Sequence, residues 1–196
     1  MNNDLCLNIL SIFTTILYSF IAAIIFYLVF QKIPFECKKK KINKYIHKKL
    51  DHYINWINKL MISAIYNNDS KTTDDYFYDF SFNSDNIETF YNEFKNINPK
   101  FTPKYYKDIG RNDLTWLNII DDLYDKSEEL FNYFFKFELY LPTRIIDILF
   151  KLINSNFYTW MDHFENTYKN QSSFNFISNQ TKEFLELLLI LKQKYK

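Results

Sequence analysis

The side chains that could perform acid–base or metal chemistry are few and poorly grouped. The three histidines are His47, His52 and His163, and the first two, five residues apart, point to different faces of a helix. They have no Glu-x-x-His pair, His-Glu-x-x-His motif or cysteine cluster beside them, so the patterns that hold di-metal centres or zinc are missing. We therefore expect solvated histidines here, and no metal ion or other cofactor.

Three acids share one face of a predicted helix: Asp121, Asp125 and Glu128. Paired carboxylates can transfer protons or bind a cation. The opposite face of this helix is apolar, however, so the acids most simply form its wet side. The alternative role for them is docking onto a basic partner.

Composition removes several further classes of function. Gly110 is the only glycine, and a phosphate-cradling loop or a series of tight hairpins needs more. Neither Arg111 nor Arg144 has a histidine shortly after it, as a helical nuclease would require. The lysines gather in residues 31–60 and the rest of the body is mildly acidic, which argues against a nucleic-acid surface. The sequence predicts a non-enzymatic protein with no identifiable small-molecule substrate.

The longest uncharged stretch runs from Leu5 to Phe30. As a helix, at about 1.5 Å per residue, it spans roughly 39 Å, and the hydrocarbon core of a bilayer is about 30 Å thick. A cleaved signal peptide would show a basic start and a shorter apolar core, whereas this chain begins Met-Asn-Asn-Asp. We expect a retained transmembrane helix over residues 5–31, with Pro34 ending it or starting the next helix.

Lysine asymmetry predicts the orientation of this helix. Only Asp4 precedes it, and eight lysines lie between residues 32 and 49. Because positive charge marks the cytoplasmic side, we expect a single-pass protein with residues 1–4 outside, a basic juxtamembrane segment over 32–41 and a cytoplasmic helical domain over 42–196. Four lysines are predicted to contact anionic lipid headgroups, or else to set topology only: Lys38, Lys39, Lys40 and Lys41.

One stripe of the membrane helix could carry self-association. Small or polar residues recur about every four positions, which lets helix backbones approach closely and hydrogen-bond across the contact. The predicted association face consists of Asn8, Ser11, Thr15, Ser19 and Ala23. Such residues are common in membrane helices, so a chance pattern is the alternative.

The remaining residues predict an all-α fold, a bundle of about five helices. A coiled-coil-like seam marks a helix over 38–66, with apolar residues at Ile46, Leu50, Tyr53, Ile57, Leu60 and Ala64. Further helices are expected over 85–97, 113–141, 145–168 and 180–194, of which the second and third would form a long antiparallel hairpin. Asp85 and Glu88 form a capping-box-like start for the first of these, and Asn112 or Asp113 is expected to cap the second. Cys6 and Cys37 imply no disulfide framework.

Residues 67–83 are the main irregular segment. Tyr78, Phe80 and Phe82 alternate with polar residues, a period of two that suits an extended, strand-like piece. The segment is expected to be a loop pinned by its rings, or alternatively an adhesive surface for a partner.

Two functional hypotheses remain after these exclusions. The first is a membrane-tethered interaction or regulatory module at the inner leaflet, whose partners are the lipid bilayer and another protein. The second is a membrane effector that oligomerises through its transmembrane helix and perturbs the bilayer. An enzyme built from unlinked residues is the least favoured class.

Overall fold

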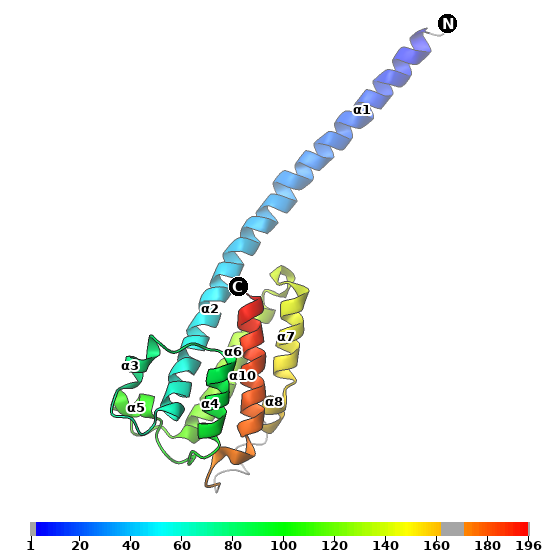
Figure 1. The fold of residues 1–196 in the computed structure, drawn as a ribbon. Helices are drawn as coiled ribbons and strands as arrows, with labels where there is room; N and C mark the ends of the chain where they lie inside the picture. Colours follow the sequence, from blue (N-terminus) through cyan, green and yellow to red (C-terminus); the bar gives the residue numbers. More distant parts are fainter. Residues whose placement is uncertain (1–2, 162–170, 196) are drawn as a thin grey trace. The chain divides into compact units, whose positions relative to one another are not determined.

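The computed structural model describes residues 3–161 and 171–195, with side chains from residue 11 onward. The chain divides into two units, Met1–Tyr45 and Ile46–Lys196, which are described separately below (Figure 1). The described residues contain helices and turns and no strand, which confirms the all-α prediction.

The first unit is helical along its described length. Helix α1 covers Asn3–Tyr27, a π-helical turn η1 covers Leu28–Lys32, and α2 starts at Ile33 and runs to Ile65. The π-helical turn is explained by the proline that follows it. Pro34 has no N–H, and its ring clashes with the carbonyl four residues earlier, so the chain widens there and the Ile33 N–H donates to the carbonyl of Leu28. Pro34 thus sits in the first turn of the next helix, as one of its two predicted roles required.

In the second unit, α2 continues to Ile65 and further helices follow. In chain order they are α3 (Thr73–Phe77), α4 (Ser84–Phe94), α5 (Lys104–Asp108), α6 (Trp116–Phe135), η2 (Glu138–Tyr140), α7 (Thr143–Ile153), α8 (Asn156–Met161), η3 (Phe174–Phe176) and α10 (Ser178–Lys194). Gly110, after α5, has a φ of 78°, a left-handed value that glycine adopts without the steric cost of a Cβ atom.

The predicted seam of α2 is buried at every position. Its members are Ile46, Leu50, Tyr53, Ile57, Leu60 and Ala64, and none is more than 5% exposed. Apolar residues at spacings of three and four lie on one side of a helix, so the pattern alone located the side of α2 that packs in this unit.

Helix α10 forms much of the centre of this unit, and Figure 1 shows it in red between α4 and α7. Its aromatic residue Phe184 is fully buried, with its ring 4.8 Å from that of Phe157. In a second cluster, the ring centroid of Phe94 lies 4.5 Å from that of Phe174 and 5.9 Å from that of Trp116. The predicted bounds of this last helix, 180–194, differ from the observed ones only at the first two residues.

The predicted irregular segment, residues 67–83, contains no strand: residues 78–79 form a turn, and residues 80–82 have no regular structure. The segment contains the short helix α3, opened by a capping box between Thr72 and Asp75. After it, Tyr78 is 90% exposed whereas Phe82 is buried. Two contacts pin the segment to the rest of the unit. Lys59 Nζ donates a hydrogen bond to Asp74 at 2.9 Å, and Tyr76 stacks on Tyr66 with ring centroids 4.0 Å apart. The period-two alternation therefore arose without a sheet to face.

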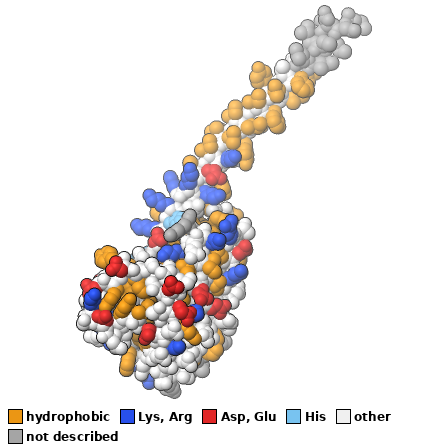
Figure 2. Space-filling model, viewed as in Figure 1, with side chains coloured by type: hydrophobic (Ala, Val, Ile, Leu, Met, Phe, Trp, Pro, Cys, Tyr) orange, Lys and Arg blue, Asp and Glu red, His pale blue; other side chains and the backbone are white. Residues whose placement is uncertain are grey.

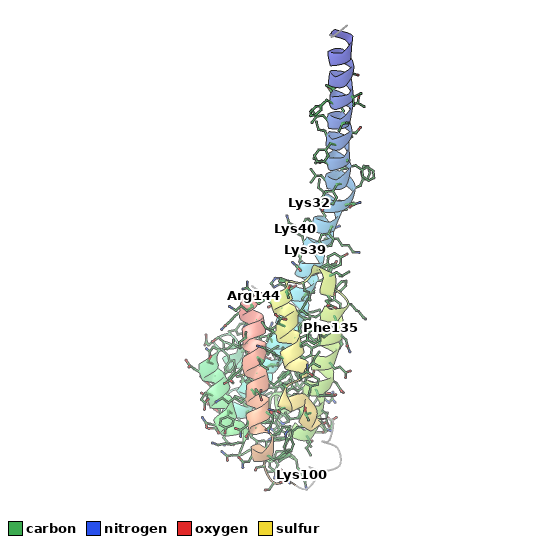
Figure 3. All side chains as sticks on the ribbon, turned by 90° about the vertical axis from the view of Figure 1, so that its right-hand side faces the viewer. Lys32, Lys39, Lys40, Lys100, Phe135 and Arg144 are labelled. Atoms are coloured by element: carbon green, nitrogen blue, oxygen red, sulfur yellow. The ribbon has the colours of Figure 1, made fainter. Side chains whose placement is uncertain are left out.

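The predicted long hairpin is shorter and broken. Helix α6 ends at Phe135, and α7 opens after Pro142, with Arg144 in its first turn (Figure 3). The second arm, predicted as one helix over 145–168, is interrupted at Asn154. The Asn154 side chain donates to the Phe150 carbonyl at 2.8 Å, and its backbone leaves helical geometry there. Residues 162–170 of the predicted arm lie outside the described residues.

Two predicted helix starts were also displaced. Asn83, and not Asp85, caps α4, because its side chain accepts the N–H of Asn86. Thr115, and not Asn112 or Asp113, caps α6 through a reciprocal box with Asn118.

Candidate functional site

The predicted association face lies on α1, and its described side chains are exposed. Two of its hydroxyls, those of Thr15 and Ser19, form hydrogen bonds within the helix. Thr15 Oγ1 donates to the carbonyl of Ser11 at 2.8 Å, and Ser19 Oγ donates to the carbonyl of Thr15 at 2.9 Å. These back-bonds satisfy the hydroxyls within their own helix, which leaves close backbone approach as the main contribution such a face offers. Ala23 is exposed, and the side chain of Asn8 lies outside the described residues.

The four lysines at 38–41 follow one another on α2, where each residue turns the helix by about 100°. They therefore point in four directions around the helix rather than along one side. Lys38, Lys40 and Lys41 are exposed and Lys39 is half-buried. Figure 3 labels Lys39 and Lys40 on this stretch. A ring of positive charge suits headgroups that surround a helix, and suits a docking groove on one side less well.

The histidines and the helix acids, for which the sequence predicted no catalytic or metal-binding role, do not form a common site in the described residues. His47 packs its ring 4.4 Å from that of Tyr195 and is half-buried, so it is only partly solvated, while His52 is exposed. His163 lies outside the described residues. The acids Asp125 and Glu128 are exposed on α6. Across residues 3–161 and 171–195, no group of three metal-binding side chains converges.

A buried hydroxyl cluster joins α2 to α6, and sequence reasoning missed it. Ser127 Oγ donates to the Leu123 carbonyl, so it accepts its second hydrogen bond from the hydroxyl of Tyr53. The Tyr158 hydroxyl, from α8, lies beside this pair without a well-aligned hydrogen bond to the described residues. Burial raises the pKa of Tyr53 and of Tyr158, so both phenols stay protonated at neutral pH. The hydrogen-bonded pair links α2 to α6, and the Tyr158 hydroxyl of α8 is buried beside it.

Removing the serine of this cluster is expected to destabilise the helical unit. Ser127→Ala leaves the Tyr53 hydroxyl buried without a partner, at a cost of about 1–3 kcal/mol. The double variant Tyr53→Phe/Ser127→Ala should lose less than the sum of the two single changes, because no polar group is then stranded. Urea unfolding followed by tryptophan fluorescence measures all three. A Ser127→Ala chain as stable as the parent would show that the bond contributes nothing.

Alkaline pH is expected to weaken the same unit. Burial raises the pKa of Tyr195 to about 12, and it raises those of Tyr53 and Tyr158 in the same direction. Below a pH of about 10 these tyrosines are protonated in both states, so their contribution is complete. Above it the unfolded chain releases protons that the folded chain retains, and stability falls as pH rises.

The check is the urea midpoint measured near pH 9 and near pH 11, the two sides of the ordinary tyrosine pKa. Tyr53→Phe should reduce the drop between them. A midpoint that rises with pH, or a drop that Tyr53→Phe leaves unchanged, would contradict the assignment.

Two of the hollows on the surface of the helical unit lie against α2. The larger, of about 660 Å³, lies where α2 and α4 end, with Trp116 and Phe101 among its apolar residues and Asp69 and Glu93 among its polar ones. The smaller, of about 230 Å³, lies between α2 and α6 and is lined by tyrosine, tryptophan and lysine. Both are formed by residues distant in sequence, so periodicity gave no signal for either.

No protein-family model, curated protein or solved structure matches this chain. The features of its own fold define the general class: a helical protein with one helix long and apolar enough to span a membrane. The function proposed below rests on those residues.

Proposed function

We propose that this protein is a single-pass membrane protein that holds a non-enzymatic interaction or regulatory module at the inner leaflet. The observation that carries the proposal is the state of α1. Its apolar side chains from residue 11 onward are exposed all round the helix, and Figure 2 shows those of one face in orange. A helix that is apolar all round needs cover that water cannot give. Its length matches the hydrocarbon core of a bilayer, which would supply that cover.

The lysines support the orientation. They begin at Lys32, directly after the apolar stretch, and continue through the ring at 38–41. Each lysine near anionic lipid gains about 1 kcal/mol of attraction. A ring of them on the inner leaflet would hold the helix at a defined depth and direct the following unit to the cytoplasm.

The second unit supports the role of a module rather than an anchor. It has its own core, including the buried α2 seam and the ring cluster around Phe184. Its hollows offer concave surface, and concave sites are where proteins most often bind ligands. A folded domain with its own core can bind a partner while the preceding helix is inserted in the bilayer.

Self-assembly through the α1 stripe is the second candidate, favoured by the four-residue spacing of Ser11, Thr15, Ser19 and Ala23. The back-bonded hydroxyls weaken it, because a hydroxyl already satisfied in its own helix gains little from a neighbour. We therefore place the tether ahead of the assembling effector.

Light scattering of the protein in lipid nanodiscs separates the two candidates. We compare the parent chain with the variant Ser11→Leu/Thr15→Leu/Ser19→Leu, which keeps the helix apolar but fills its stripe. A monomer in both supports the tether. A discrete oligomer that the leucine variant loses would overturn it in favour of the effector.

A further inference from the structure

The smaller hollow is a groove between two antiparallel helices, α2 and α6. Helix α2 contributes Lys49, His52, Tyr53 and Trp56, and helix α6 contributes Lys126, Glu129, Leu130 and Tyr133. All eight residues belong to the Ile46–Lys196 unit. The groove can therefore be interpreted without reference to the membrane helix.

The two ends of this groove repeat one arrangement. At one end Lys49 Nζ from α2 lies 5.7 Å from the ring centroid of Tyr133 on α6. At the other end the roles of the helices are exchanged, and Lys126 Nζ from α6 lies 5.4 Å from the ring of Trp56 on α2. Antiparallel packing generates this exchange, since early residues of one helix face late residues of the other. Each end thus pairs an aromatic face with a cation.

The aromatic side chains present flat apolar surface. Trp56 is half-buried and stacks toward Tyr53, with centroids 6.1 Å apart, and Lys126 Nζ lies 5.4 Å from the centroid of its ring. These contacts hold the indole in place, so it is an ordered wall. Aromatic rings prefer to bind other rings in offset or edge-on geometry. A volume of about 230 Å³ is below the range of drug-sized pockets, which limits the occupant to a small ring.

The lysines give the groove a preference for negative charge. Lys49 Nζ lies 3.6 Å from Glu129 Oε1, but the two side chains are 54% and 77% exposed, so this pair is weak and easily exchanged. Lys126 forms no ion pair with any residue in the described part of the chain. Two cations that line a common cavity, with one exposed carboxylate among the other lining residues, suit an anionic ligand.

The alternative is that each lysine merely covers a ring. That arrangement occurs elsewhere in this unit, where Lys95 Nζ lies 5.3 Å from the ring of Tyr91. Neither of those two residues lines the groove. What distinguishes the groove is that two such pairs open onto one cavity whose size fits a single ring.

We propose that the groove between α2 and α6 binds a single aromatic ring carrying an anionic group, such as an aryl phosphate. The ring lies between Trp56 and Tyr133, and the anion accepts hydrogen bonds from Lys49 or Lys126. The same chemistry occurs in a free aryl phosphate and in a phosphotyrosine side chain of a partner protein. The inference concerns the helical unit and stands independently of the proposed membrane role.

Calorimetric titration of the full chain, in nanodiscs of zwitterionic lipid, tests the proposal with phenyl phosphate as the probe. Phenyl phosphate should bind at least about tenfold more tightly than inorganic phosphate, because the ring adds stacking. Lys49→Gln/Lys126→Gln should weaken binding by about tenfold or more, and Trp56→Leu by a similar factor. Lys95→Gln, which uncovers a ring outside the groove, is the matched control and should change nothing.

A phosphotyrosine peptide separates the two sources of the ligand. A peptide that binds about tenfold more tightly than phenyl phosphate assigns the groove to a partner protein. Equal affinities assign it to a free small molecule. Lack of binding, equal affinity for inorganic phosphate, or full binding by the Lys49→Gln/Lys126→Gln chain would overturn the proposal.

Discussion

Replacing Phe184 with alanine is expected to lower the unfolding free energy of the helical unit by about 3–5 kcal/mol. The side chain is fully buried on α10, and its ring lies against Phe157 at 4.8 Å, Tyr158 at 6.1 Å and Phe131 at 6.4 Å. These neighbours come from α6 and α8, so the change opens a cavity where three helices meet. Domains are stable by only about 5–15 kcal/mol, so a loss of this size removes a large share of the stability.

The measurement is urea unfolding followed by tryptophan fluorescence, to which Trp116, buried against Phe94 in the same unit, contributes. Ile190→Ala is the matched control, because it shortens an apolar residue on the same helix that is already 41% exposed. It should cost well under half as much. Equal losses for the two variants would show that α10 is not packed as described.

Placing two arginines in the middle of α1 is expected to release the chain from the membrane. Leu17 and Ile21 lie one turn apart near the centre of the apolar stretch, and both are exposed. A central arginine costs about 2.5–3.5 kcal/mol of insertion free energy, so Leu17→Arg/Ile21→Arg costs about 5–7 kcal/mol. That loss shifts an insertion equilibrium by roughly four powers of ten.

Fractionation of cells after an alkaline carbonate wash measures the effect. The parent chain should stay in the pellet and the arginine variant should move to the supernatant. The control Leu17→Ile/Ile21→Leu keeps the apolar content and should pellet with the parent. A parent chain that carbonate extracts, or an arginine variant that remains in the pellet, would count against a spanning helix.

Sequence periodicity predicted those helices whose buried face repeats regularly. The α2 seam and the last helix are of this kind, because burial there follows a spacing of three and four residues along one element. Helix ends were predicted less well. Asn112, Asp113 and Thr115 are all good caps, and the choice among them depends on Trp116 being drawn into the core beside Phe94.

The break at Asn154 and the helix at 73–77 have a similar cause. Both segments have sequence patterns that fit more than one local structure, and side-chain hydrogen bonds decide between them. Asn154 bonds back to the Phe150 carbonyl, and Asp75 completes a capping box with Thr72. Such contacts depend on geometry that periodicity does not contain.

The hydroxyl cluster and the α2–α6 groove could not be predicted from the sequence, because each depends on contacts between separate helices. Ser127 sits among charged residues that mark a wet face, yet it is fully buried because Tyr53, distant in sequence, reaches it across the helix interface. The α2–α6 groove likewise depends on the register of two helices. The stripe on α1 and the lysine ring, in contrast, are local patterns, and the sequence was enough to locate them.

The most direct test of the central claim is the accessibility of two introduced cysteines from either side of the membrane. In a chain with Cys6→Ser and Cys37→Ser, Ser70→Cys is placed on an exposed turn of the helical unit, and Asn3→Cys, in a second chain, precedes the apolar stretch. An impermeant maleimide added to intact cells should label the Asn3→Cys chain only, and permeabilised cells should label both. Labelling of the Ser70→Cys chain in intact cells would contradict a cytoplasmic module held by a spanning helix.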